Sequence, residues 1–411
     1  MNRLQKIIGY FFVYVLICLM STFFSAWFPA ISPSQWLLIA AVVLSVFING
    51  KFYGTKPFIF LLMYFVVMYF NWRSGDKHFH EISICFFEFM VPLFAMNFCI
   101  IANKECESFN KVIIVVFTVI IAIAAIGSII ASQVLPEIVR NMQSETSGDI
   151  DALRAYYRLG VSNYSLPHAL PAVVPLLVYA LKANKRFSIV WLFYLLSLIF
   201  CLLLIFYSGA SGAILIAMFA MAISLLTSLN GISKQRIFWI CIVFVPFIVS
   251  NSLADGIVRF LIDIFGNNAD FESFTEHLVD ISESLTSESG GTGDVGARVD
   301  KYQETFNAVF DNIILGTNME SGGHMALIDR LAYLGLVGFI PLILTYYYYL
   351  KSVSVQVNFR VKPFFVESVI CAFMMMILKN MIHNEMNVVL FAMIPIMALY
   401  FSRNSEKSNP I

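Results

Sequence analysis

Long apolar runs recur along the whole chain, and they constrain its fold more than any other feature of the sequence. Runs of roughly 18 residues or more are long enough to cross the hydrocarbon core of a bilayer. A segment in lipid must satisfy its own backbone hydrogen bonds, so only helix bundles and closed barrels span membranes. The apolar residues are continuous rather than alternating, which indicates helices. The sequence therefore predicts an all-α polytopic membrane protein, a single transmembrane domain over residues 1–411.

About twelve transmembrane helices are expected. Only 13% of the residues are charged, against about 25% in soluble domains, which argues against a water-soluble fold. Prolines at 167, 171 and 175 should break the sixth span. The predicted spans are 7–28, 35–50, 57–72, 82–103, 111–135, 166–182, 187–208, 211–229, 237–255, 324–350, 364–383 and 386–402.

Basic residues predict the orientation of the bundle. With the N-terminus inside, the cytoplasmic connections hold sixteen of the 26 lysines and arginines, in short segments beside the helix ends. Such an excess of basic residues marks cytoplasmic loops. Both termini are therefore expected in the cytoplasm. The sixteen are Arg3, Lys6, Lys51, Lys56, Lys104, Lys111, Lys182, Lys185, Arg186, Lys234, Arg236, Lys351, Arg360, Lys362, Arg403 and Lys407.

Two long loops are predicted on the opposite side, over 136–165 and 256–323. The second is acidic, with twelve Asp and Glu residues against three basic ones. Apolar residues repeat in it at helical spacing, which predicts two amphipathic helices resting on the bundle or in the headgroup region; a solvated, partly disordered loop is the alternative. The two stripes are Phe271, Phe274, Leu278, Ile281 and Leu285, and then Val299, Tyr302, Phe306, Val309, Phe310 and Ile313.

Candidate functional residues are ionisable groups in or beside the spans on the external side. The chain has no phosphate-binding P-loop, no zinc-protease motif and no nucleophile elbow. A charge at membrane depth is costly and is by default a functional hypothesis. The candidates are Arg154, Arg158, His168, Arg298, His324, Asp329, Arg330, Lys379, His383 and Glu385.

Each candidate also has a structural interpretation. Asp329 and Arg330 can form a charge-compensated pair, and His168 can be a satisfied core histidine. Lys379 can extend to the membrane surface. Glu88 in the fourth span is interpreted as a hydrogen-bonded structural acid or a proton-linked group. Several arginines around one cavity suit a phosphate or pyrophosphate, because the guanidinium fork pairs bidentately with phosphoryl oxygens.

Three parts of the sequence carry a resemblance to a known family. They are Arg158-Leu159-Gly160 with Asn163-Tyr164, then Ser208 to Ala213, and finally Arg298, Asn312 to Gly316, His324 and Leu334 to Gly338. In these parts the chain resembles the Wzy-type O-antigen and capsular polysaccharide polymerases, whose superfamily includes the O-antigen ligases. Helix count, topology and the two long loops agree with that family. Gly212, Ile313 and Met325 depart from its motifs.

The resemblance implies a glycosyltransferase with a GT-C-like bundle in the bacterial inner membrane. It would transfer a growing glycan from undecaprenyl pyrophosphate to an incoming lipid-linked repeat unit, making O-antigen of lipopolysaccharide or capsule. Partners would be a chain-length-regulating co-polymerase and a flippase, and no nucleic acid. His324 and Arg298 are then the predicted catalytic residues, with His383 or Glu385 as second choice for the base. Arg154, Arg158, Arg330 and His383 are the predicted pyrophosphate- or glycan-binding residues.

We expect no cofactor and no metal ion, because arginines can stabilise the leaving pyrophosphate; activity in excess chelator tests this. Two other functions stay open at this stage. An O-antigen ligase shares the loop architecture and differs in its acceptor. A lipid-linked oligosaccharide flippase or proton-coupled transporter also suits twelve spans, but has less need of a structured external loop.

Overall fold

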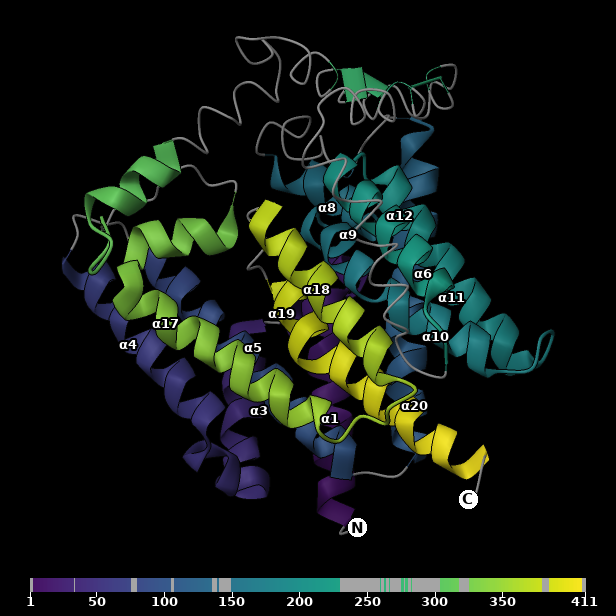
Figure 1. Cartoon of the computed structure of the whole chain (residues 1–411), viewed down its shortest axis with the longest axis horizontal. Helices are drawn as coiled ribbons and strands as arrows, with labels where there is room; N and C mark the ends of the chain where they lie inside the picture. The colour runs from purple at the N-terminus through teal and green to yellow at the C-terminus, as the bar shows by residue number, and fades with distance from the viewer. Residues whose placement is uncertain are drawn as a thin grey trace.

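The computed structural model describes residues 3–32, 34–74, 80–104, 107–134, 149–229, 304–317, 325–378 and 384–408, and a few isolated positions between them. These residues are helical almost throughout and hold no strand (Figure 1). The main helices are α1 (Arg3–Met20), α2 (Thr22–Trp27), α3 (Ser34–Asn49), α4 (Lys56–Ser74), α5 (His80–Lys104), α6 (Glu107–Ser132), α8 (Ile150–Arg158), α9 (Ser165–Ala169), α10 (Val174–Ala183), α11 (Ile189–Tyr207), α12 (Ser211–Leu226), α17 (Ala326–Ser354), α18 (Lys362–Leu378), α19 (Asn384–Val388) and α20 (Ile394–Ser408).

The lengths and apolar compositions of the helices indicate which of them could span a membrane. Within the described residues, six helical stretches are long and apolar enough to cross a membrane, and a bent pair, α9 with α10, makes a seventh if it is counted as one span. The prediction of an all-α membrane protein is thereby confirmed. The predicted span 237–255 lies outside the described residues. The six stretches are Pro29–Gly54, Cys85–Lys104, Glu107–Ser132, Ile189–Tyr207, Ala326–Ser354 and Asn384–Ser405.

Two of the predicted spans are interrupted. The prolines of the sixth span do bend it, by 44° between Ser165–Ala172 and Val174–Ala183, as expected. The first predicted span, 7–28, is instead two helices, α1 and α2. Ser21 has extended backbone and its hydroxyl accepts a hydrogen bond from the Phe24 amide at 3.2 Å. A serine that caps a new helix ends the previous one, and this was not expected from the apolar run.

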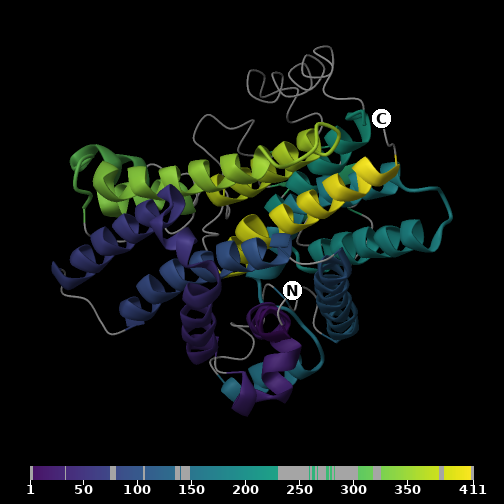
Figure 2. The ribbon, with the colours of Figure 1, turned by 90° about the horizontal axis from the view of Figure 1, so that it is seen from below.

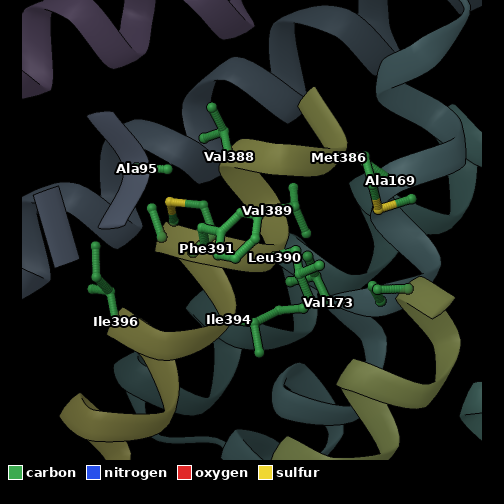
Figure 3. Close-up of a cluster of buried hydrophobic side chains, with 14 of the residues drawn as sticks. Ala95, Ala169, Val173, Met386, Val388, Val389, Leu390, Phe391, Ile394 and Ile396 are labelled. Carbon is green, nitrogen blue, oxygen red and sulfur yellow. The ribbon is translucent and has the colours of Figure 1, made fainter. Parts of the chain in front are cut away.

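The last span is the centre of the bundle. Its apolar stretch within Asn384–Ser405 is completely buried, and Figure 3 shows side chains from Met386 to Ile396 packed among Ala95, Ala169 and Val173. Seen from below in Figure 2, this yellow span lies between green α17 and α18 and the blue and teal helices. A buried helix that is apolar on all sides is typical of such a position.

A π-helical turn, η5 (Val389–Met393), joins α19 to α20. Pro395 has no amide hydrogen, so the Phe391 carbonyl loses its usual helical donor. The Tyr349 hydroxyl donates to that carbonyl at 2.6 Å instead. Both groups are buried, so this bond from α17 compensates for the proline and connects α17 to the central span.

Helix α17 packs along α4 and is broken at Gly335, where φ is 60° and ψ is −171°. The segment at 312–317 supplies hydrogen bonds at this break. The Leu336 amide donates to the Ile313 carbonyl at 2.9 Å, and the Thr317 amide donates to the Ala332 carbonyl at 2.9 Å. The end of the second long loop is therefore attached to α17 by backbone bonds, which satisfy the groups that the break would expose.

Several helix ends meet at one end of the bundle, which we call the basic end. Lys104 at the end of α5 donates to Asn49 at the end of α3, at 2.7 Å. Asn103 donates to Gln356, just beyond α17, at 3.0 Å and accepts from Arg403 of α20 at 2.5 Å. Both chain termini lie at this end in Figure 1.

Both long loops contain helical residues where the structure describes them. Residues 150–158 of the first loop form α8, a helix that the sequence analysis did not predict. In the second loop, residues 304–311 are helical. Thr305 and Val309 are buried on one side, and Phe306 and Phe310 are exposed. Leu278 of the first predicted stripe is buried, and Phe271, Phe274, Ile281, Leu285, Val299 and Tyr302 lie outside the described residues.

Candidate functional site

The segment from α8 to α9 builds the best-defined polar site away from the basic end. Asp149 caps α8, accepting from the amides of Asp151 at 2.9 Å and Ala152 at 3.2 Å. The helix ends at Arg158, and Gly160 then takes φ +98° against Gly127 of α6. A side chain at Gly127 would overlap the Gly160 backbone. The two glycines thus bring the turn after α8 into backbone contact with a membrane-spanning helix.

Helix α2 fixes the same turn from another side. Thr22 donates to the Val161 carbonyl at 2.8 Å, and the Trp27 indole donates to the Arg158 carbonyl at 3.1 Å. The Arg158 guanidinium lies over the Trp27 ring, 5.7 Å from its centre, and its Nε donates to the Ala26 carbonyl at 3.4 Å. This cation–π contact orients an exposed arginine at the edge of the bundle.

Glu385 receives the other end of the segment. Its carboxylate, on α19, accepts hydrogen bonds from the Asn163 amide and, at 2.7 Å, from the Ser165 hydroxyl. The residue is only 5% exposed. A carboxylate offers about four acceptor positions, so two donors leave it able to accept more. Glu385 is therefore an oriented buried acid with remaining acceptor capacity.

Aromatic and imidazole groups surround this acid. Burial raises the pKa of Tyr157 on α8, and the charge of Glu385 raises it further. His168, buried on α9, has its Nδ1 at 2.8 Å from the Tyr164 carbonyl, and its ring packs edge-on against the Tyr164 ring. His168 is thus a buried histidine whose Nδ1 is paired with a backbone carbonyl four residues earlier.

Arg154 lies on the exposed side of α8. Its side chain is 54% exposed and pairs with Asp151, one helical turn earlier, at 3.5 Å. Exposed pairs of this kind contribute about 0–1 kcal/mol. The guanidinium of Arg154 is therefore accessible from solvent and only weakly held.

Arg330 lies in a different cluster. It forms an ion pair with Glu88 of α5, and the Tyr64 hydroxyl of α4 donates to the same carboxylate at 2.6 Å. Asp329 accepts from the Met325 amide at 2.9 Å and from Thr305 at 3.3 Å. The Arg330 charge is compensated by Glu88, and Glu88 is a hydrogen-bonded, paired acid. A role of Arg330 in binding pyrophosphate stays a prediction.

The remaining predicted site residues are not among those described. Arg298, His324, His383 and Lys379 all fall in ranges that the structure leaves undescribed, so their roles stay predictions. The short segment 158–165 begins at Arg158. Asn163 and Ser165, which donate hydrogen bonds to Glu385, lie at its other end.

Asn163, Ser165 and Tyr157 were not predicted as site residues. Asn163 follows Arg158 by five positions, and the resemblance proposed for this segment was the one indication available from sequence. Ser165 and Glu385 are 220 positions apart, and no local pattern links them.

In the part of the chain that is described, no group of three or more His, Cys, Asp or Glu side chains is arranged to hold a metal ion. Comparison with protein-family models and with curated proteins finds no match for this chain.

Proposed function

We propose that this protein is a membrane glycosyltransferase that polymerises repeat units linked to undecaprenyl pyrophosphate, as the resemblance to Wzy-type polymerases implies. In this proposal the chain crosses a bacterial plasma membrane about twelve times in a GT-C-like bundle. The basic end faces the cytoplasm, and the α8–α9 segment faces outward.

The proposal depends mainly on one observation: hydrogen bonds connect the buried acid Glu385 to the segment that begins with Arg158. Asn163 and Ser165 hold Glu385 at one end of residues 158–165, and Trp27 orients Arg158 at the other. A transferase of this type needs both chemistries in one region of the membrane surface: a group that accepts the proton of the acceptor hydroxyl, and cations for the leaving diphosphate.

Each of these groups would have a definite role in the reaction. The acceptor hydroxyl oxygen attacks the anomeric carbon of the donor glycan, and the bond from that carbon to the pyrophosphate oxygen breaks. The hydroxyl proton passes to a base, and the electron pair leaves with the pyrophosphate. Arg154 and Arg158 would stabilise that negative charge, together with Arg298. His324 stays a predicted base, and Glu385 is the candidate whose surroundings support this role.

An experiment in cells separates a polymerase from a flippase. The variant Glu385→Gln keeps the size of the side chain and an oxygen that can accept from Asn163 or Ser165, but removes the basic carboxylate. The proposal predicts that its cells make no long glycan and still carry single repeat units on the outer face of the membrane. Repeat units trapped on the inner face would instead indicate a flippase.

The matched control is Glu107→Gln, at the start of α6 and in an ion pair with Lys111 at 3.0 Å. It makes the same change outside the α8–α9 site, and glycan length should be unchanged. A wild-type glycan ladder from Glu385→Gln would refute the role of Glu385.

A further inference from the structure

A cavity of about 360 Å³ lies at the basic end, between α4, α5 and α17. Its inner wall includes the buried residues Cys99, Tyr349 and Leu399, and its rim includes the exposed Lys56, Ser352 and Gln356. Small-ligand sites are of this size, mainly apolar, with a few polar groups that set orientation. The cavity therefore combines an apolar interior with a polar, basic mouth.

Lys56 is the only cation among the residues that line it. Its ammonium lies over the Tyr348 ring, 4.9 Å from the centre, and that ring stacks on Phe60 with centres 5.5 Å apart. Within the described chain, Lys56 has no ion pair with a carboxylate. The cation is thus oriented by an aromatic ring, and no carboxylate of the described residues compensates its charge.

Polar residues of the rim connect the cavity to a second positive charge, Arg403, which lies outside its lining. Arg403 donates to Asn103 at 2.5 Å, and Asn103 donates to Gln356 at 3.0 Å. Asn103 and Gln356 both line the cavity. No acidic residue is among the described residues that line it, so the nearby cations Lys56 and Arg403 favour an anionic ligand.

We propose that this cavity binds an anionic membrane phospholipid, with an acyl chain along the apolar wall and the phosphate at Lys56. Charge complementarity supports an anionic headgroup, because basic pockets between membrane helices bind such headgroups. The apolar interior supports a lipid rather than a free sugar phosphate, which would leave its hydroxyls without partners there. The site is at the opposite end from the α8–α9 segment and does not depend on the proposed polymerase activity.

Native mass spectrometry of the intact purified protein tests this. The protein is titrated in separate samples with phosphatidylglycerol and with phosphatidylcholine of identical acyl chains, and bound lipid is counted. Wild type should retain phosphatidylglycerol preferentially. Lys56→Gln should weaken phosphatidylglycerol binding about fivefold, the equivalent of about 1 kcal/mol for one charge at a phosphate, and leave phosphatidylcholine binding unchanged.

The matched control is Lys185→Gln, which removes an exposed lysine from the α10–α11 connection outside the cavity. It should bind both lipids as wild type does. Equal losses in the two variants would overturn the proposal, because the effect would then come from net charge. Equal affinity of wild type for the two lipids would also overturn it.

A second variant tests the cavity itself. Ser352 is exposed on the rim, and Ser352→Phe places a ring in the opening while retaining Lys56. Binding of both lipids should fall, with the protein still monodisperse on size exclusion. Undiminished phosphatidylglycerol binding by Ser352→Phe would contradict a site in the cavity, whatever the result at Lys56.

Discussion

Gly316 and Gly335 pack backbone against backbone where the second long loop meets α17. Both have positive φ, +78° and +60°. A methyl group added to Gly335 would overlap the Ile314 carbonyl and the Gly316 amide, and one added to Gly316 would overlap the Tyr333 carbonyl. The segments that contain Gly316 and Gly335 are therefore in direct contact, and this close packing explains why glycine stands at both positions.

Gly335→Ala should destabilise the protein. The Gly335 backbone, with φ 60° and ψ −171°, is in a region that essentially only glycine occupies. A residue with a side chain would lose about 1–3 kcal/mol there, and the overlap adds to this. Gly54→Ala is the control, since nothing lies within 4 Å of its added methyl and its φ is not positive; it should change the unfolding free energy by less than about 0.5 kcal/mol. Thermal unfolding in detergent measures both, and equal melting temperatures would contradict the packing.

Arg330 and Glu88 should show strong energetic coupling. Their side chains are 15% and 6% exposed, and loss of one partner from a buried pair costs about 3–5 kcal/mol. Arg330→Met and Glu88→Gln should therefore each destabilise strongly, and the double variant by less than their sum. Additive effects in this cycle would contradict a direct pair. Arg154→Met, from an exposed pair, should cost at most about 1 kcal/mol.

The raised pKa of Tyr157 predicts that the folded protein loses stability at alkaline pH. Because burial and the Glu385 charge raise its pKa when folded, the unfolded chain loses this proton first. Stability is thus intact below the ordinary phenol pKa of about 10 and falls as pH rises above it. Tyr157→Phe should reduce the fall in melting temperature between about pH 9 and 11. Tyr156→Phe, also on α8, controls for removal of a phenol, and an unchanged slope in Tyr157→Phe would contradict the assignment.

Most of the membrane helices follow directly from local sequence. Continuous apolar runs predict α3, α5, α6 and α11, and the prolines predict the bend of the sixth span. The break at Ser21 was missed because a single capping serine hardly alters an apolar run. Helix α8 was missed because it is not apolar overall, although Asp149 before Ile150, Leu153 and Tyr157 is a capped amphipathic pattern.

The site was less predictable for a physical reason. Arginines and histidines at the membrane edge are visible in the sequence as costly groups, but their partners are not. Glu88 and Arg330 are 242 positions apart and meet only after α4, α5 and α17 have packed. The same holds for Asn163 and Glu385, 222 positions apart. A single sequence contains the candidates, and tertiary packing decides which are neutralised and which stay available.

The function of Arg158 should depend on the planar shape of its guanidinium as well as on its positive charge. Arg158→Lys keeps the cation but loses the planar fork that pairs with phosphoryl oxygens. We expect kcat/KM for glycan extension to fall about tenfold, and about 100-fold in Arg158→Ala. Arg186→Ala, which changes an exposed residue of the α10–α11 connection, should leave kcat/KM unchanged. An equal rate in wild type and Arg158→Ala would remove Arg158 from the site.

Turnover by the purified protein shows whether this chain itself forms glycosidic bonds. The substrate is a synthetic repeat unit on polyprenyl pyrophosphate, supplied in excess chelator, and the readouts are glycan length and released polyprenyl pyrophosphate. We expect extended glycan with one pyrophosphate carrier released per bond formed, and a loss of at least about 100-fold in the rate of Glu385→Gln. No extension by a correctly folded wild-type protein, or the same rate in Glu385→Gln, would contradict it.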